Sequence, residues 1–274
     1  RSECVKKGQL TPHYHYVSRP PFTEAEAVRR AIYLAGQTDT PLYIAHMTCR
    51  EAIAELQKAK GTGQRVSGET CTHYLTTTKE VLDNPDFNEA AKFVCSPALR
   101  DREDCEALWQ ALSDGLLTAV SSDHCGIDVA ELKQAGRNDF TQIPNGSPGA
   151  GDRLHMVWTE GVCTGKLTRQ KFVDVIATQP AKINGIYPRK GTLAVGSDAD
   201  VVIFDPNYEG TVHLADNPNG VDYNLYEGRR QSGRVETVLL RGQVVVENAK
   251  FVGRYGQGKF IPANMYASGY ENRN

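Results

Sequence analysis

Two short apolar runs in this sequence each lead to a residue that can bind a metal ion. The run that begins at Leu42 leads to His46, and the run that begins at Leu117 leads to Asp123. A short apolar run bounded by turn residues is typical of a buried strand, and (β/α) barrels keep their chemistry at the carboxyl ends of such strands. Imidazole and carboxylate are the usual ligands of catalytic zinc. The two positions together therefore favour a metal-dependent hydrolase over a binding module.

The chemistry that such ligands support is the hydrolysis of an unreactive amide. A metal ion lowers the pKa of its bound water to about 7, so that hydroxide is available at neutral pH. A single strand-end histidine would more often be an ordinary hydrogen-bonded group, but two positions at neighbouring strand ends indicate a site.

A third candidate ligand, His15, lies in the segment His13-Tyr14-His15. In a strand, residues two apart face the same way, so an H-x-H pair can offer two nitrogens to one metal. This pair precedes His46 too closely, because the interval holds only one βα unit. We therefore treat His15 as a lone ligand and His13, beside Pro12, as a surface residue.

Composition limits the possible partners. The chain has 274 residues, of which 40% are hydrophobic and 23% charged, so it can bury a large core. Its net charge of -2 gives no electrostatic footprint for nucleic acid or an anionic membrane. Its seven cysteines never occur as C-x-x-C, which argues against a disulfide framework and favours a reducing, cytoplasmic setting. No apolar stretch is long enough to span a membrane.

Helical patterns alternate with short apolar runs between about residues 22 and 188, as in consecutive βα units with a parallel sheet. Thr23 and Glu26 predict a capping box for the first of these helices. The other predicted helices are 49–60, 78–84, 102–114, 152–164 and 168–178, and the predicted runs are 42–44, 66–71, 93–95 and 117–123. Three or four units are present where a closed barrel needs eight, so we expect an incomplete barrel.

Two features divide the rest of the chain. Residues 128–153 form a long irregular segment, which is functional or a mobile surface loop. Past Gly191 the pattern changes to short β-type runs, which marks a boundary near 190. We expect a partial barrel over 1–190, part of a β-sandwich over 191–252, and a tail, 253–274, that contacts another subunit. The fold class is therefore α/β, the C-terminal part of a TIM-like (β/α)8 metal-dependent hydrolase barrel followed by strands of a small β-sandwich.

Several motifs, in unbroken order, resemble the dihydropyrimidinase and D-hydantoinase family of cyclic amidohydrolases. The segments are His15-Tyr16-Val17-Ser18-Arg19-Pro20-Pro21, Ile44-Ala45-His46, Gly68-Glu69-Thr70-Cys71, Cys95-Ser96-Pro97 with Leu99-Arg100, Ser122-Asp123-His124-Cys125, Ile143-Pro144-Asn145-Gly146, Gly191-Thr192-Leu193, Gly196-Ser197-Asp198-Ala199-Asp200-Val201 and Val221-Asp222-Tyr223-Asn224. The resemblance covers almost the whole chain but only the C-terminal part, a little over half, of a family member.

The resemblance implies a binuclear metal site, most simply zinc with two ions per full-length subunit, that opens the ring of a dihydropyrimidine or 5-substituted hydantoin to give an N-carbamoyl amino acid. By position, His15 and His46 would bind one metal ion, while Asp123 would bind the other and act as the base. Ser96 and Asn145 match positions that bind the cyclic imide. The partners implied are a small ring substrate and further copies of the chain, as a tetramer or dimer.

The sequence also departs from the family pattern. Gly126 stands where proline is usual and Gly151 where glutamate is usual, which concerns loop rigidity more than reaction class. The family's first-strand H-x-H pair and carboxylated lysine would lie before residue 1, so we expect the chain to be part of something longer and to show little activity by itself. His124 is interpreted as a packing or supporting group, and Arg19 and Glu69 as ligand-orienting residues or a buried ion pair.

Other interpretations stay open. An allantoinase or dihydroorotase would open a related ring, although the segment around Asn145 and residues 221–224 favour the hydantoinase group. A non-catalytic, dihydropyrimidinase-related scaffold protein usually loses metal ligands, whereas His15, His46 and Asp123 are all present. A truncated pseudo-enzyme that only oligomerises is the remaining alternative.

Overall fold

A computed structural model describes residues 1–264, and its chain divides into two compact units that are described separately below. Unit 1 comprises Arg1–Arg153 and Thr211–Arg229. Unit 2 comprises Leu154–Gly210 and the described chain from Arg230 onward. We call Thr211–Arg229 the strap, because it belongs to unit 1 although the chain on both sides of it belongs to unit 2. None of the helices within residues 1–264 is long and apolar enough to cross a membrane.

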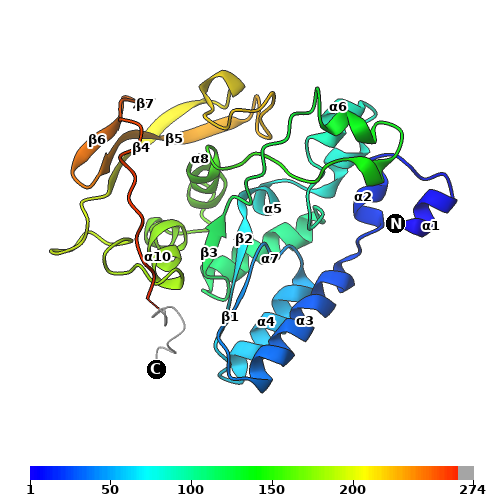
Figure 1. Ribbon diagram of the computed structural model, residues 1–274, viewed down its shortest axis with the longest axis horizontal. Coiled ribbons are helices and arrows are strands. Elements are labelled where there is room, and N and C mark those ends of the chain that lie inside the picture. Colours follow the sequence, from blue (N-terminus) through cyan, green and yellow to red (C-terminus); the bar gives the residue numbers. More distant parts are fainter. Residues whose placement is uncertain (265–274) are drawn as a thin grey trace. The chain divides into compact units, whose positions relative to one another are not determined.

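Unit 1 is built from short parallel strands and the helices that connect them (Figure 1). The strands are β1 (Leu42–Ile44), β2 (Val66–Cys71) and β3 (Ala119–Ser121), and the helices are α1 (Ser2–Lys6), α2 (His13–Val17), α3 (Pro21–Gln37), α4 (Arg50–Gly61), α5 (Thr72–Thr76), η1 (Lys79–Asp83), α6 (Phe87–Ala91), α7 (Arg102–Ser113), η2 (Lys133–Gly136), η3 (Phe140–Gln142) and, in the strap, η6 (Leu214–Asp216).

The strands of unit 1 form a sheet in the order β1-β2-β3, with both pairs parallel. β1 pairs with the first half of β2, from Leu42 opposite Val66, and β3 pairs with the second half, as far as Ser121 opposite Cys71. Helices α3 and α4 lie side by side in Figure 1, and α4 packs on β2 and α7. All three strands therefore present their carboxyl ends at one edge, as the predicted βα units require.

Helices α4 and α7 form where the sequence predicts them, and each buries one side. In α4 the buried residues Ala52, Ile53, Leu56 and Ala59 form one stripe at helical spacing. In α7 the buried Trp109 donates its indole N–H to the carbonyl of Leu75 at 3.0 Å. The predictions 49–60, 66–71 and 102–114 are confirmed within one residue.

Helix α3 departs from the prediction at its start. It begins at Pro21, with Pro20 as N-cap and no side-chain capping bond. Thr23 lies inside the first turn and donates its hydroxyl to the carbonyl of Pro20 at 2.8 Å, so the predicted capping box with Glu26 is wrong. A proline at the first helical position needs no partner for an N–H, which explains why the helix starts there. Val28 is the buried residue of α3.

The apolar run 93–95, predicted to be strand-like, is also a correction, because these residues form a turn and irregular chain. The carbonyl of Val94 accepts the main-chain N–H of Gly146 at 3.0 Å rather than a neighbouring strand. The 128–153 segment contains two short 3-10 helices, η2 and η3, and it is anchored by the fully buried Lys133 and Phe140.

Unit 2 combines short helices with an antiparallel sheet. Its elements are α8 (Arg153–Val157, starting at the boundary), the π-helix η4 (Trp158–Val162), α9 (Arg169–Val173), the π-helix η5 (Asp174–Thr178), α10 (Gln179–Ile183), β4 (Val201–Thr211, ending at the strap), β5 (Arg230–Leu240), β6 (Gln243–Glu247) and β7 (Lys250–Phe251). The sheet order is β4-β5-β6-β7. Thr168 caps α9 through a 3.1 Å bond that its hydroxyl accepts from the N–H of Lys171.

The turn between β5 and β6 is formed by Arg241 and Gly242. Arg241 and Gly242 have φ values of +49° and +79°, the pair of positive angles that a tight hairpin needs. The strands themselves are longer than predicted, with β4 reaching Thr211 and β5 starting at Arg230. The predicted domain boundary near 190 falls inside unit 2, so the compact units do not coincide with the predicted domains, whose extents stay predictions. Part of the predicted tail, 265–274, lies outside the described residues.

Candidate active site

Each strand of the parallel sheet is followed, two residues after it ends, by a side chain that can bind a metal or move a proton. His46 follows β1, His73 follows β2 and Asp123 follows β3. His46 and Asp123 have φ values of +41° and +44°. A residue with a side chain pays about 1–3 kcal/mol for such a backbone, and strained residues of this kind gather at functional sites. The geometry therefore singles out the same two residues as the sequence.

His15 lies on helix α2 rather than on a strand, and its side chain is fully buried. Its Nε2 lies 2.7 Å from the carbonyl oxygen of Cys95. A carbonyl can only accept, so Nε2 carries the proton and Nδ1 keeps its lone pair. Nδ1 is buried and has no hydrogen-bond partner among the described residues. Burial lowers the pKa of His15 to about 3, which keeps the ring neutral and suited to bind a metal.

The neighbouring histidine behaves differently. His13 is partly exposed, and its Nδ1 lies 2.6 Å from a carboxylate oxygen of Asp83. Because the segment is helical, His13 and His15 do not share a face as they would in a strand. The surface assignment of His13 is consistent with this pairing.

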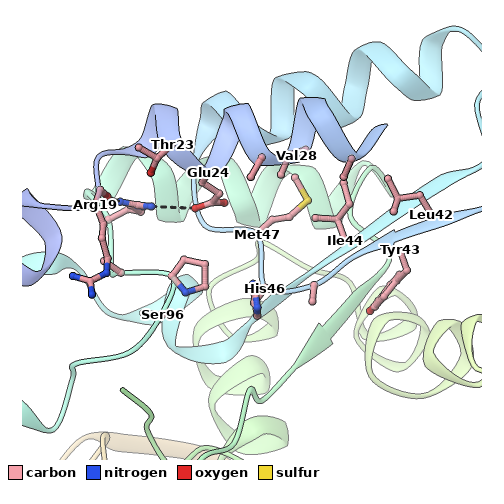
Figure 2. A pocket seen from close by; sticks show the side chains of 16 residues that line it. Arg19, Thr23, Glu24, Val28, Leu42, Tyr43, Ile44, His46, Met47 and Ser96 are labelled. Carbon is pink, nitrogen blue, oxygen red and sulfur yellow. Dashed lines mark hydrogen bonds and ion pairs between the residues drawn. The ribbon is translucent and has the colours of Figure 1, made fainter. Parts of the chain in front are cut away.

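His46 lines a pocket of about 640 Å³ together with Arg19 and Ser96. Figure 2 shows Ile44 and Met47 on the side of β1 that faces α3, whereas Tyr43 and His46 point to the other side. Residues two apart in a strand face the same way, so the opposite sides taken by Ile44 and His46 show that the strand alternation ends with β1, before the positive φ of His46.

A buried charged network holds the chain just after His46. Glu24 accepts the main-chain N–H of Thr48 at 2.7 Å and is paired with Arg100 at 3.1 Å. Arg100 also donates to the Thr48 hydroxyl at 2.9 Å and to the carbonyl of Arg19. Arg100 and Glu24 are almost fully buried, with side chains 5% and 10% exposed. This network links α3, the segment after β1 and the loop that carries Ser96.

Arg19 and Glu69 do not form the ion pair that was one interpretation of them. Arg19 donates to the carbonyl of His15 at 3.0 Å, and Glu69 accepts the hydroxyl of Tyr43 at 2.5 Å. Each therefore contacts the segment that leads to a candidate ligand.

The two candidate ring-binding residues meet directly. The hydroxyl of Ser96 donates to the side-chain oxygen of Asn145 at 3.0 Å, across 49 residues of sequence. The amide of Asn145 donates to the carbonyl of Ile143 at 3.2 Å, and Ser96 follows the residue whose carbonyl binds His15. The two polar side chains and the buried imidazole thus lie along one run of contacts.

Asp123 is exposed, and its negative charge reaches the buried groups nearby. Burial raises the pKa of the Cys95 thiol to about 11, and the charge of Asp123 acts in the same direction. The adjacent His124 accepts the N–H groups of Gly149 and Ala150 at 3.3 and 3.4 Å. His124 therefore fastens the loop after Asn145 to the end of β3, a supporting role that agrees with its interpretation.

The strap packs onto these loops. The carboxylate of Asp222 accepts the N–H groups of Val129 and Ala130 at 2.9 and 2.8 Å. The buried carboxylate of Asp152 accepts amide groups from three asparagines of the strap at 2.7–3.2 Å, namely Asn217, Asn219 and Asn224.

The two glycines that depart from the family pattern lie under the strap. A Cβ atom on Gly126 would come within 2.8 Å of Val221, and one on Gly151 within 2.8 Å of Asn217. These departures therefore make room for the strap.

The sequence of the chain matches the profile of the amidohydrolase family over residues 26–245. The chain belongs to the amidohydrolase family. Members of this family are generally metal-dependent, and the family fold is of the TIM-barrel type with mixed α/β content. The α/β class and the family resemblance predicted from sequence are thereby confirmed.

Similar proteins narrow the comparison within the amidohydrolase family. The chain is 47% identical over 266 residues to a D-hydantoinase of Ralstonia pickettii, covering 97% of this chain and 58% of that protein. It is 39% identical to a dihydropyrimidinase of Arabidopsis thaliana, covering 95% of this chain and 49% of that protein. The crystal structure of a dihydropyrimidinase from Brevibacillus agri NCHU1002 superposes with a TM-score of 0.95 at 43% identity, covering 97% of this chain and 57% of that one. The chain thus spans about half the length of the relatives that it matches.

Three side chains of this amidohydrolase chain have the chemistry of metal ligands. His15 offers a buried imidazole nitrogen without a partner, and His46 and Asp123 offer an imidazole and a carboxylate at adjacent strand ends. These are the donors of hydrolytic metal sites. Within residues 1–264, however, no three His, Cys, Asp or Glu side chains come close enough together to bind a metal ion. The donors present therefore fit a divalent metal as part of a ligand set.

Sequence reasoning missed three buried polar residues, His73, Lys133 and Asp152. His73 has a buried Nε2 atom with no partner among the described residues. Burial lowers the pKa of His73 to about 3, and the charge of the nearby His46 acts in the same direction. Its signal was its place just after the predicted strand 66–71. Asp152 could have been found from the asparagine-rich strap, whereas nothing in the local sequence marks Lys133.

Proposed function

We propose that the protein opens the ring of dihydropyrimidines or 5-substituted hydantoins, hydrolysing the cyclic amide bond to give N-carbamoyl amino acids. The observation that carries the proposal is the run of contacts from His15 through Cys95 to Ser96 and Asn145. Through Cys95, it links a neutral imidazole that has one unpartnered nitrogen to two polar groups that can bind a ring amide. The names of the similar D-hydantoinases and dihydropyrimidinases support the same reaction class.

Each residue has a distinct task in the proposed reaction. His15, through Nδ1, and His46 would bind one divalent metal ion, and Asp123 would bind the second. Zinc is the expected metal, and the other ligands would come from outside these 274 residues. The bound metal would supply Lewis acidity and a water of lowered pKa. Ser96 and Asn145 would hold the N–H and C=O groups of the imide, because a hydroxyl and an amide can each donate and accept.

Asp123 would move the proton. The water oxygen adds to the ring carbonyl carbon, the bond from that carbon to the ring nitrogen breaks, and Asp123 transfers the proton of the water to the departing nitrogen. The product then carries a carboxylate and an open ureido group. Asp123 is exposed and has a strained backbone, which keeps its carboxylate at the carboxyl end of β3. We further propose a homo-oligomer, a tetramer or dimer, as the working form.

Ring opening of dihydrouracil and 5-phenylhydantoin, measured by chromatography with added Zn²⁺, tests this function. The longest available form of the protein that contains these 274 residues is used. We expect Asp123→Asn to lower kcat by roughly 10²–10⁴-fold, the usual contribution of a positioned acid or base.

Asp39→Asn is the matched control. Asp39 also has a positive φ, +48°, and is exposed, but it lies before β1 and pairs with Arg65. The kcat of Asp39→Asn should equal that of the parent protein. Normal turnover by Asp123→Asn would show that Asp123 is not the base, and no ring opening by any metal-loaded form would defeat the proposed reaction.

A further inference from the structure

Lys133 is a fully buried lysine in the loop between β3 and Asn145. Its ammonium donates to the carbonyls of Ala91 and Gly146, both at 2.7 Å, and lies 3.4 Å from those of Lys92 and Val94. Three of these carbonyls come from the end of α6 and the turn after it, where main-chain acceptors lack helical partners. The fourth comes from a segment more than fifty residues later. One cationic group thus joins two distant stretches of main chain.

The groups that contact the Lys133 ammonium are carbonyls and an aromatic ring. No ion pair joins Lys133 to a carboxylate within residues 1–264. The ring of Tyr223, from the strap, lies 5.7 Å from the ammonium, and the Tyr223 hydroxyl donates to the carbonyl of Lys92 at 3.3 Å. An ammonium has three donors and no acceptor, and a methionine of similar length would fill the volume but donate nothing. The buried charge therefore serves to hold carbonyl groups.

The segments held by Lys133 are those that carry the ring-binding pair. Gly146 follows Asn145 directly, and its N–H donates to the carbonyl of Val94 at 3.0 Å. Ser96 lies two residues after Val94 and meets Asn145 at 3.0 Å. Cys95, between them, binds His15 through its carbonyl. Lys133 thus binds the main chain next to Cys95, whose carbonyl fixes the tautomer of His15, and next to Asn145, which meets Ser96.

We propose that Lys133 is a positioning residue whose buried ammonium clamps the Ser96 loop to the Asn145 loop and so sets the spacing of the two groups that bind the ring. The role in ring binding rests on the proposed function, whereas the clamp itself does not. Loss of the ammonium would loosen the two loops, which would be left with the direct Gly146–Val94, Ser147–Lys92 and Ser96–Asn145 hydrogen bonds. The parallel sheet and α4 would stay in place.

Hydrogen-deuterium exchange of Lys133→Met tests the clamp without any assay of activity. Lys58→Met is the matched control, since Lys58 lies on α4 of the same unit with its side chain 66% exposed. We expect exchange at least tenfold faster in peptides 92–97 and 143–149 of Lys133→Met, with peptides 50–61 and 66–71 unchanged. Equal acceleration throughout unit 1, or none in the two loops, would overturn the clamp.

A measurement on the unmodified protein keeps the test valid if Lys133→Met fails to fold. At pH 6, ¹⁵N-detected spectra should show a slowly exchanging ammonium signal for Lys133, with scalar coupling across hydrogen bonds to the carbonyl carbons of Ala91 and Gly146. Exposed Lys58 provides the reference for fast exchange. An ammonium of Lys133 that exchanges as fast as that of Lys58 would contradict the proposal.

Kinetics separate this proposal from the proposed function. In the form of the protein that opens hydantoins, Lys133→Met should raise KM for the ring by about tenfold or more and change kcat less, because misplaced polar groups weaken ring binding. Lys58→Met should leave both constants unchanged. Local loop exchange without an effect on KM would remove the link to ring binding. Absence of ring opening in every variant, with the loop exchange as expected, would defeat the proposed function alone.

Discussion

At the scale of single residues, the buried histidines hold the site in one protonation state. His15 and His73 are buried, and each has one ring nitrogen without a partner among the described residues. In both cases burial is the largest cause of a pKa lowered to about 3. A neutral imidazole can bind a metal, whereas a protonated one cannot. The fold therefore keeps both rings neutral across the neutral pH range.

The same burial predicts sensitivity to acid. In the unfolded chain both rings bind a proton below about pH 6.5, whereas in the folded chain they stay neutral until about pH 3. The unfolded state thus binds more protons in this window. The free energy of unfolding should fall as the pH falls from 6.5 toward 3, by up to about 1.4 kcal/mol per pH unit for each ring.

Urea unfolding at pH 7, 5.5 and 4.5 measures this slope. His73→Gln removes one of the two rings and should halve their joint contribution, and His213→Gln, at an exposed histidine beside Glu227, is the control for the substitution itself. A His73→Gln variant with the parent slope would show that His73 does not stay neutral in the fold.

At the scale of elements, the segment after β1 depends on a buried ion pair. Glu24 of α3 joins Arg100 and the main chain of Thr48. Breaking a buried pair leaves an uncompensated charge, so Glu24→Gln should lower the free energy of unfolding by about 3–5 kcal/mol. Glu26→Gln, on the same helix in an exposed pair with Arg30, should cost about 0–1 kcal/mol. Equal losses in the two variants, measured by urea unfolding, would contradict this account.

The strap depends on small residues beneath it. Gly151→Glu restores the residue usual in the family, but its side chain would meet Asn217, Pro218 and Asn219 within 3.2 Å. Overpacking of this kind costs about 1–3 kcal/mol, so we expect a fall in Tm of several degrees. Gly61→Glu at the end of α4 has open space around it and should change Tm little. A Gly151→Glu variant as stable as Gly61→Glu would mean that the strap moves aside freely.

Particular residues show how far the sequence could predict these elements. Periodicity located α4, α7 and β2 because their apolar residues make a local pattern, and the strand-end rule located His46 and Asp123. The apolar-run rule failed at 93–95, where the carbonyl of Val94 accepts hydrogen bonds from Lys133 and from the N–H of Gly146 instead of from a strand. Lys133 itself carries no local signal, because its partners lie about 13 to 42 residues away. The roles of the predicted site residues remain proposals for the same reason, since most of a metal site is formed by distant parts of a chain.

At the scale of the whole molecule, an apolar helix surface is left exposed on unit 1. On α3 the side chains of Phe22, Tyr33 and Leu34 are 66%, 64% and 58% exposed, and β1 is an edge strand of the sheet. Exposed apolar patches and open edges favour association. We expect the 274-residue chain to self-associate at micromolar concentrations.

Sedimentation velocity over a range of concentrations measures this association. The triple variant Phe22→Ser, Tyr33→Ser, Leu34→Ser should shift the protein toward the monomer, and Val195→Ser, at an exposed apolar position of unit 2, should not. A monomeric parent at all concentrations would contradict the expectation.

The path of the strap has a consequence for how the protein is made. Residues 1–153 contain the strand ends and the site loops, yet the carboxylate of Asp152 and the main-chain N–H groups of Val129 and Ala130 are hydrogen-bonded by residues 217–224 of the strap. A ribosome adds residues in order, so most of unit 2 must emerge before those partners exist. Unit 1 therefore cannot complete its folding during synthesis until the strap has left the exit tunnel, and a pause in translation before that point would prolong an immature state of the site.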